Sequence, residues 1–275
     1  MINIYYHNSE RGPGKVINNL TKGLNELSIP FKKNGTDKSW KNLILQDHPA
    51  LYDDRLENSL IGPNVCVIPV DNHIVLQQKY KKILVPSEWV KNLYKRWVNE
   101  DKILVWPVGI DTEKFENKKS DPKVFDCLIY SKNRTDDELG FVTNFLTSKN
   151  QTYNVIKYGH YYESNFIDLI SKSKYGFVLA NTESQGIAIQ EMMSCNLPLL
   201  VWDVVKWVDR GVEYEVDATS VPYWDSSCGL KIYNRGELES SYDKFITNLD
   251  KYNPRDFIVN NLSIKKQTND LVNNL

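Results

Sequence analysis

The stretch YGFVLANTESQGIAIQEMMSCNLPLLVWD, residues 175–203, decides the fold expected for this chain. It begins with a continuous apolar run, passes through a polar turn into a helical pattern, and returns to a second apolar run. Continuous apolar strands that alternate with helices are typical of parallel sheets covered on both faces. The stretch therefore predicts a strand–helix–strand unit of an α/β fold.

The same alternation extends along the chain in two series. Short apolar runs predict strands at 2–6, 42–47, 64–71, 82–87, 102–108, 124–132, 153–159, 175–181, 197–203 and 229–234. Helical patterns lie at 14–27, 87–100, 135–149, 163–174, 187–195 and from 254 onward. A polar, lysine-rich stretch at 113–123 separates the two series. They predict two Rossmann-like domains whose parallel sheets face each other across a cleft.

The expected boundaries follow from the two series. We expect an N-terminal domain at residues 1–111, a C-terminal domain at 112–253, and a helix at 254–275 for which a return to the N-terminal domain stays open. Ligands of open α/β sheets bind beyond the carboxyl ends of the strands, so the loops that follow strands are the places to seek chemistry.

Composition narrows the class of protein. The 275 residues are 41% hydrophobic, which suits sizeable cores, and the 34 basic and 35 acidic residues leave a net charge of −1. A near-neutral chain argues against nucleic acid as the main partner, because phosphates require a basic surface. The four cysteines have no metal-site spacing and are read as free thiols in a reducing compartment. With no apparent signal peptide or membrane span, a soluble, cytoplasmic protein is expected, and peripheral membrane contact stays open.

The turn after the strand at 175–181 combines features of a phosphate site. Free amides at a helix start attract anions, and Gly186 lets the backbone approach a ligand. Glu191 lies about five residues into the helix, so roughly 7 Å along its axis, and suits two vicinal hydroxyls such as those of a ribose. Glu183, before the helix, suits hydroxyls of a second group. The alternative is that both glutamates are ordinary helix-start and solvent-facing acids, but the apolar neighbours of Glu191 argue against it.

These residues carry a resemblance to a known family. Residues 183–200, ESQGIAIQEMMSCNLPLL, resemble the E-x7-E signature of GT-B glycosyltransferases of the family 4 type, which usually reads E-G-F-G-L-P-x-x-E-A-M-A-C-G-x-P-V-I. The segments at 12–24, 83–96 and 103–115 are similar to the family's glycine loop with its first helix, its S-E-W segment and its domain junction. The resemblance covers residues 11–275, with an N-terminal domain shorter than is usual in the family.

The resemblance implies a role for each residue of the signature. Glu183 would contact the donor sugar and Glu191 the ribose, with the pyrophosphate facing the backbone of Ser184, Gln185, Gly186 and Ile187. The family also neutralises the leaving diphosphate with an Arg and a Lys after the first strand of the second domain. Lys132 and Arg134 supply this charge here, but their spacing differs from G-R-x5-K-G. Which of the two acts is therefore open.

The predicted acceptor side lies in the first domain. Gly12 and Gly14 form either a loop that approaches the donor or an ordinary tight turn, and not a Walker A loop. Family members often place a His near the donor sugar, which His48 or His73 would fill. Asp47 or Asp71 would orient the acceptor.

The function expected from the resemblance is a retaining, metal-independent glycosyltransferase. It would use a nucleoside-diphosphate sugar as co-substrate, no cofactor, and a glycan or glycolipid acceptor. The rival readings are a GT-B epimerase or phosphorylase, and a non-catalytic relative that binds nucleotide or glycan. A GT-A enzyme and a dinucleotide oxidoreductase are disfavoured, because D-x-D and G-x-G-x-x-G motifs are missing. The base, the sugar, the acceptor and the oligomeric state stay undetermined.

Overall fold

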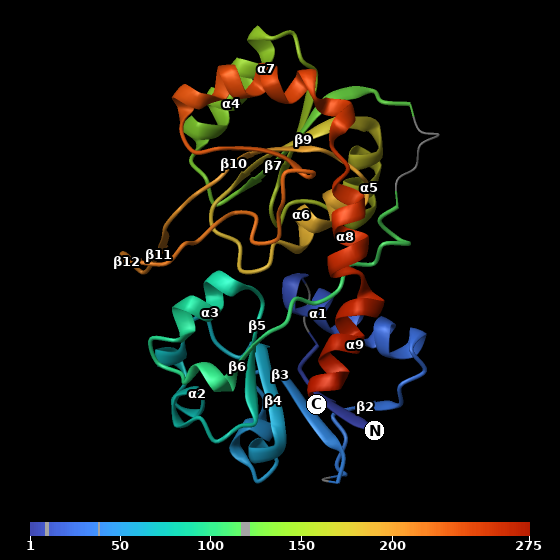
Figure 1. The fold of residues 1–275 in the computed structure, drawn as a ribbon, viewed down its shortest axis with the longest axis vertical. Coiled ribbons are helices and arrows are strands. Elements are labelled where there is room, and N and C mark those ends of the chain that lie inside the picture. The colour runs from blue at the N-terminus through green and yellow to red at the C-terminus, as the bar shows by residue number, and fades with distance from the viewer. Residues whose placement is uncertain (9–10, 38, 117–121) are drawn as a thin grey trace. The chain divides into compact units, whose positions relative to one another are not determined.

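Each of two units of the chain is built on a parallel β-sheet (Figure 1). The computed structural model describes residues 1–8, 11–37, 39–116 and 122–275. The first unit comprises Met1–Gly109 and Leu262–Leu275, and the second comprises Ile110–Asn261. The predicted α/β class with two parallel sheets is confirmed.

The first unit has, within its described residues, a six-stranded sheet in the order β2-β1-β3-β4-β5-β6, with parallel pairing throughout. Its strands are β1 (Ile2–Tyr5), β2 (Phe31–Lys33), β3 (Lys41–Gln46), β4 (Ser59–Asn64), β5 (Lys82–Val85) and β6 (Ile103–Val105). Its helices are α1 (Arg11–Glu26), α2 (His73–Gln77), α3 (Glu88–Tyr94) and α9 (Ile264–Asn274). Trp106 Nε1 donates to Gln267 O at 2.9 Å, which ties α9 to the end of β6.

The second unit has a five-stranded sheet in the order β13-β10-β9-β7-β8, again parallel among the described residues. Its strands are β7 (Phe125–Lys132), β8 (Tyr153–Lys157), β9 (Ser173–Ala180), β10 (Leu199–Trp202) and β13 (Gly229–Ile232). Its helices are α4 (Asp136–Ser148), α5 (Glu163–Lys172), α6 (Ile187–Ser194), α7 (Leu238–Thr247) and α8 (Pro254–Leu262). An antiparallel hairpin, β11 (Trp207–Asp209) and β12 (Val212–Tyr214), is inserted after β10.

The two sheets share a strand order around their first strands. In the first unit β1 lies between β2 and β3, and in the second unit β7 lies between β8 and β9. The direction of strand addition therefore reverses between β1 and β3, and again between β7 and β9. Such a reversal opens a crevice at the carboxyl ends of the two strands, where ligands of open α/β sheets bind.

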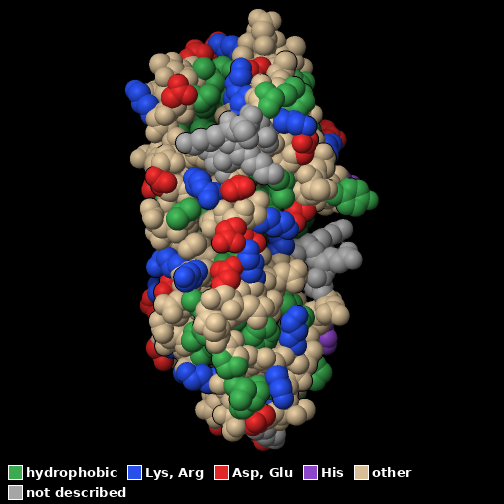
Figure 2. All heavy atoms as spheres, turned by 90° about the vertical axis from the view of Figure 1, so that its right-hand side faces the viewer, with side chains coloured by type: hydrophobic (Ala, Val, Ile, Leu, Met, Phe, Trp, Pro, Cys, Tyr) green, Lys and Arg blue, Asp and Glu red, His purple; other side chains and the backbone are tan. Residues whose placement is uncertain are grey.

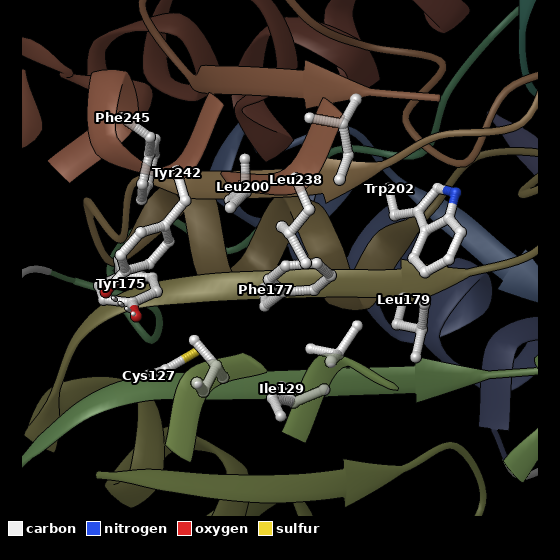
Figure 3. Close-up of a cluster of buried hydrophobic side chains, with 13 residues drawn as sticks. Cys127, Ile129, Tyr175, Phe177, Leu179, Leu200, Trp202, Leu238, Tyr242 and Phe245 are labelled. Carbon is white, nitrogen blue, oxygen red and sulfur yellow. Dashed lines mark hydrogen bonds between the residues drawn. The ribbon is translucent and has the colours of Figure 1, made fainter. Parts of the chain in front are cut away.

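One face of the second sheet is covered by α4 and α7. Buried side chains from β7, β9 and β10 pack there against Val142 and Leu146 of α4 and against Leu238, Tyr242 and Phe245 of α7. Figure 3 shows Phe177 between Ile129 and Leu238 in this core. The Tyr175 and Tyr242 hydroxyls lie 3.3 Å apart at the amino end of β9. This packing holds the strands whose carboxyl ends carry the candidate site.

The strand predicted at 64–71 is wrong. The strand in this region is β4, whose Ser59, Leu60 and Ile61 pair with β3. Gly62 and Pro63 belong to its end, although in sequence they look like the turn before a strand. The apolar run that follows is a loop with a 3-10 turn at Pro69–Asp71, where Val67 and Val70 are 64% and 48% exposed. Pro69 has no N–H and so cannot donate to a ladder.

Other elements differ in length. The predicted helix at 87–100 ends at Tyr94, and the C-terminal helical pattern is two helices that meet at Ser263, which is extended at the start of α9. Strand β2, the hairpin and α7 were not expected from the sequence. The polar linker at 113–123 falls partly on residues 117–121, which lie outside the described residues.

The surface carries charges of both signs. On the face shown in Figure 2, described basic and acidic side chains lie among one another. The four cysteines all lie among the described residues, and none forms a disulfide. Among the described residues, no helix is long and apolar enough to cross a membrane.

Candidate functional site

The loop between β9 and α6 carries the two glutamates of the sequence signature. Strand β9 ends at Ala180, and α6 begins after Gly186, whose φ of 79° and ψ of 45° lie in the left-handed region. Glycine adopts this conformation without the steric cost that a Cβ brings. The chain therefore turns sharply here and leaves Glu183 before the helix and Glu191 inside it.

Glu183 forms an ion pair with Lys132, the last residue of β7. Lys132 Nζ donates to Glu183 Oε2 at 2.8 Å, and the two side chains are 18% and 8% exposed. Burial raises the pKa of the Glu183 carboxyl, and the charge and hydrogen bond of Lys132 oppose that rise. The ammonium also lies 4.2 Å from the centre of the Tyr158 ring. The arrangement holds a cation in place beside a largely buried carboxylate.

This pair lies at the carboxyl ends of two neighbouring strands of the second sheet. Lys132 ends β7 and Glu183 follows β9, the two strands between which the strand order reverses. The sequence analysis sought chemistry in the loops that follow strands; Glu183 lies in such a loop, whereas Lys132 is the last residue of its strand. The geometry thus brings a positive charge and an acceptor group to the point where an α/β sheet ordinarily binds its ligand.

The start of α6 is fixed by a pair of buried glutamines. Gln185 Nε2 donates to Gln190 Oε1 at 3.1 Å, and Gln190 Nε2 donates to the Gln185 carbonyl at 2.7 Å. Ser184 is exposed, whereas Gly186 is buried. The first N–H groups of a helix have no partner inside the helix and, with the helix dipole, favour an anion. Residues 184–187 can therefore hold a phosphate group.

Glu191 is buried within α6, with 2% of its surface exposed. Burial, followed by the charge of Glu191, raises the pKa of the Tyr161 hydroxyl. Tyr161 lies in the loop that follows β8. Its ring packs on that of Phe166 in α5, with 5.0 Å between the ring centres. Tyr158 and Tyr161 were not singled out from the sequence, although their position after a strand is the same signal that identified the other loops.

Arg134 is engaged by the sheet itself. Its Nε donates to Ala180 O at 3.0 Å and its Nη2 to Trp202 O at 2.7 Å, which joins the ends of β9 and β10. Its Nη1 donates to Glu138 Oε1 at 2.8 Å, in the first turn of α4. Since three different groups already accept from this guanidinium, Lys132 is better disposed than Arg134 to meet a ligand.

Asp203 and its partners were missed by sequence reasoning. Asp203 follows β10 and is 3% exposed. Its carboxylate accepts hydrogen bonds from Thr219 and Lys231, at 2.8 Å each. The signal was present as a charged residue at the end of an apolar strand, but its partners lie 16 and 28 residues further along the chain.

Replacement of Gly186 by Ala should destabilise the protein by about 1–2 kcal/mol, the cost of a Cβ in left-handed backbone. The added Cβ has room, since its nearest neighbour is Glu183 Cβ at 3.6 Å, so backbone strain sets the effect. Gly140→Ala is the matched control, because Gly140 lies inside α4 with open space around it, and this change should stabilise by roughly 0.5–1 kcal/mol. Urea unfolding measures the free energy of unfolding of both variants. If Gly186→Ala is as stable as Gly140→Ala, the backbone at residue 186 is not strained by a Cβ.

The first unit places two histidines beyond the carboxyl ends of neighbouring strands. His7 follows β1 and His48 follows β3, and their ring centres lie 4.9 Å apart. The His48 Nδ1 accepts from the Ala50 N–H at 3.1 Å, which leaves the proton of the neutral ring on Nε2. Burial, and then the charges of His7 and Arg55, lower the pKa of His48, whereas Asp53 and Asp47 raise it. His48 therefore favours its neutral form and presents an N–H donor.

Removal of the neighbouring imidazole should raise the pKa of His48. In His7→Asn the charge of His7 no longer lowers the pKa of His48. Burial, Arg55, Asp53 and Asp47 continue to act on it. Proton NMR titration of the His48 ring measures the change. His73→Asn serves as the control and should leave the pKa of His48 where it is; an unchanged or lower value in His7→Asn contradicts the coupling.

The other acceptor-side candidates lie in two places. The Tyr52 hydroxyl donates to Asp47 Oδ1 at 3.2 Å, and the Tyr52 ring lies 6.0 Å from that of His73, so Tyr52 brings these two candidates together. Asp71 ends the 3-10 turn at Pro69–Asp71 and His73 begins α2, so neither directly follows a strand as expected. The reason is the displacement of the strand to β4.

Gly12 and Gly14 lie in a helix, and so in neither the donor-facing loop nor the tight turn that the sequence left open. Helix α1 begins at Arg11, so that both glycines and Pro13 lie in its first turn. Proline is tolerated there because the first N–H groups of a helix have no carbonyl partner in any case. Among the described residues, no cluster of His, Cys, Asp or Glu side chains is arranged to hold a metal ion.

Comparison with known proteins identifies the fold. No model of a known family matches the sequence, and no curated protein matches it. A structure of S. aureus TarM in complex with fondaparinux, alpha-GlcNAc-glycerol and UDP is similar over 94% of this chain, with a TM-score of 0.60 and 12% identity. The chain spans 58% of the length of that TarM chain.

Two further structures match over the full length. The lipopolysaccharide outer core galactosyltransferase WaaB is similar over 100% of this chain and 99% of its own, with a TM-score of 0.61 and 9% identity. Sucrose-phosphate synthase from Thermosynechococcus elongatus is similar over 99% of this chain and 97% of its own, with a TM-score of 0.59 and 9% identity. At such identities the likeness concerns the fold, and the chain has the GT-B fold of two Rossmann-like domains.

Proposed function

We propose that this protein transfers a sugar from a nucleoside-diphosphate sugar to an acceptor hydroxyl, as a retaining glycosyltransferase of the family 4 type. The observation that carries the proposal is the Lys132–Glu183 ion pair beside the start of α6, at the crevice of the second sheet. A cation, helix amides and two carboxylates lie within one loop and its neighbours. These are the groups needed to bind a diphosphate that is flanked by hydroxyl-bearing rings.

The ligand is assigned along the loop in three parts. Glu183 accepts hydrogen bonds from hydroxyls of the donor sugar, the amides of residues 184–187 face the diphosphate, and Glu191 accepts from the ribose hydroxyls. The burial of both glutamates supports this assignment, because hydrogen bonds to a charged group are strongest away from water. The resemblance to the E-x7-E signature supports the same order.

Lys132 is proposed to stabilise the leaving group. In the reaction the bond between the anomeric carbon and the diphosphate oxygen breaks, and the electron pair stays on the diphosphate. The acceptor oxygen bonds to the anomeric carbon on the same face, and its proton passes to an oxygen of the donor phosphate. Negative charge thus develops beside the ammonium of Lys132, whose position is fixed by Glu183 before the reaction begins. Arg134 holds the ends of β9 and β10 in place.

The acceptor is proposed to bind at the crevice of the first sheet. His48, with Nε2 as donor, and Asp47, held by Tyr52, are the groups assigned to the donor sugar and the acceptor hydroxyl. The acceptor is a glycan or a lipid-linked glycan, and the reaction requires neither a metal nor a cofactor. The glycosyltransferases of similar fold support this class of substrate.

The test is a thermal-shift panel of UDP-, GDP-, ADP- and dTDP-sugars, followed by analysis of products. The UDP bound to the S. aureus TarM structure makes UDP-sugars the first members of the panel. We expect one base to stabilise the protein and the matching sugar to be transferred with release of the nucleoside diphosphate. An epimerised donor or a sugar phosphate would identify the epimerase or phosphorylase, binding without turnover would identify a non-catalytic relative, and no binding at all would reject the proposal.

A further inference from the structure

Asp203 gathers a set of hydrogen bonds at the carboxyl end of β10. Its Oδ1 accepts from the backbone N–H groups of Val204 and Ser220, at 2.8 and 2.7 Å. Both of its oxygens accept from the Thr219 hydroxyl, at 2.8 Å each. Its Oδ2 also accepts from Lys231 Nζ at 2.8 Å, in an ion pair whose carboxylate is 2% exposed. One carboxylate therefore joins residues on both sides of the hairpin insertion.

The residues held by Asp203 lie against the Glu183 loop. The Glu183 N–H donates to Thr219 O at 3.0 Å, and the Ser220 hydroxyl donates to Ala180 O at 3.0 Å. Ser220 O also lies 3.7 Å from the place that a Cβ of Gly186 would take. A continuous path of contacts therefore runs from Asp203 through Thr219 and Ser220 to the loop that carries Glu183.

Stability alone does not account for this arrangement. Removing two charges from water is costly, and a well-packed apolar pair of similar volume is often as stable as a buried ion pair. The ionic arrangement instead fixes directions, because each acceptor bond of the carboxylate sets the position of one donor. The donors that Asp203 positions include the Thr219 hydroxyl and the Ser220 N–H, and the Thr219 carbonyl in turn accepts from the Glu183 N–H.

We propose that Asp203 is a positioning residue of the donor site, which holds Thr219 and Ser220 so that the loop of Glu183 keeps its ligand-binding geometry. The proposal rests on the proposed function insofar as the ligand is a nucleoside-diphosphate sugar. Asp203 touches neither donor nor acceptor, and it acts through the Thr219 carbonyl that receives the Glu183 N–H.

Paired variants at Thr219 test the path. Thr219→Val removes the hydroxyl that Asp203 accepts from, and Thr219→Ser keeps it. Asp203→Asn keeps the shape but loses the charge opposite Lys231. The ligand is the nucleotide sugar that stabilises the wild type in the thermal-shift panel. We expect Thr219→Val and Asp203→Asn to weaken its binding roughly tenfold, the effect of losing one hydrogen bond to a charged group. Thr219→Ser should bind as the wild type does.

Tyr175→Phe is the control for stability. It removes a buried hydroxyl contact near the amino end of β9, at the opposite end of the strand that the Glu183 loop follows. We expect it to lower the melting temperature and leave donor affinity unchanged. If Asp203→Asn and Thr219→Val also lower only the melting temperature, with donor affinity intact, the proposal is overturned.

Hydrogen–deuterium exchange of the Glu183 amide gives a readout that needs no ligand. We expect faster exchange in Asp203→Asn and Thr219→Val, and wild-type exchange in Thr219→Ser and Tyr175→Phe. If Asp203→Asn and Thr219→Val exchange faster but the wild type binds no nucleotide sugar, the positioning of the loop is upheld and the proposed function is rejected. Unchanged exchange in Asp203→Asn rejects the positioning role itself.

Discussion

Glu191→Gln is expected to weaken binding of the nucleoside diphosphate roughly 100-fold, or about 3 kcal/mol, because one hydrogen bond from a ribose hydroxyl to the carboxylate is lost and the other becomes a bond to a neutral oxygen. An amide retains one acceptor oxygen and turns an NH₂ group toward the second hydroxyl. Glu191 is 2% exposed, so water does not compensate for the lost acceptor. Titration calorimetry with the active nucleoside diphosphate measures the change, and thermal stabilisation by the same ligand should largely vanish.

The control for Glu191 is a glutamate on the surface of the same unit. Glu239 lies in α7 with a side chain that is 75% exposed, so Glu239→Gln should leave nucleotide affinity and stability close to those of the wild type. The variant Glu191→Gln must also keep its fold, which circular dichroism checks. Wild-type nucleotide affinity in folded Glu191→Gln removes the ribose assignment.

Lys132→Met is expected to reduce transfer by about 1,000-fold, because a positioned group that stabilises developing charge contributes about 3–4 kcal/mol to the barrier. Methionine keeps an unbranched stem beside the Tyr158 ring and removes only the ammonium. The donor should bind more weakly as well, since its diphosphate loses a cation. Measurement of nucleoside-diphosphate release at saturating donor separates the two effects.

The stability of the same variant should fall more steeply with increasing pH than that of the wild type. Burial already raises the pKa of Glu183, and the substitution removes the Lys132 charge and hydrogen bond that oppose that rise. Between the unfolded pKa, about 4.5, and the raised folded pKa, the folded state binds more protons than the unfolded state, so stability falls as pH increases. The deficit of Lys132→Met relative to the wild type should therefore be small near pH 5 and about 2–3 kcal/mol near pH 8.

A second substitution isolates this effect. In Lys132→Met combined with Glu183→Gln, the carboxylate that Lys132 would pair with is gone as well, so the pH-dependent part of the stability deficit should disappear while transfer stays low. Urea unfolding at the two pH values measures stability, and product release measures transfer. A deficit that is the same at both pH values contradicts the account of the pair.

The strand–loop–helix–strand unit at 175–203 could be predicted because its signals are local. An apolar run, a polar turn with Gly186 and a second apolar run describe β9, α6 and β10 without reference to the rest of the chain. Strand β4 could not be placed in the same way. Gly62 and Pro63 at its end are residues typical of turns, so the pairing of β4 with β3 was not expected. The valines Val67 and Val70 belong to an apolar run that predicts a strand, but both are exposed in a loop.

The candidate site was predictable where it consists of neighbours in sequence. The spacing of Glu183 and Glu191 is readable in one segment, whereas the roles of Lys132 and Arg134 depend on what each side chain contacts. Arg134 donates to carbonyls of β9 and β10, whereas Lys132 donates to Glu183. The spacing of the two residues in the sequence does not show which of them makes which contact. The contacts of Asp203 with Thr219 and Lys231 join residues that are 16 and 28 positions apart, so the sequence does not reveal them either.

The central claim, that one loop holds a sugar, a diphosphate and a ribose in that order, is tested most directly by a crossed calorimetric titration. The wild type, Glu183→Gln and Glu191→Gln are each titrated with the nucleoside diphosphate and with its sugar conjugate. The account predicts that Glu183→Gln loses the affinity contributed by the sugar and keeps most of its affinity for the nucleoside diphosphate, because Lys132 and the helix amides remain. It predicts that Glu191→Gln loses affinity for both ligands. Equal losses for both ligands in the two variants, or no loss in either, would contradict it.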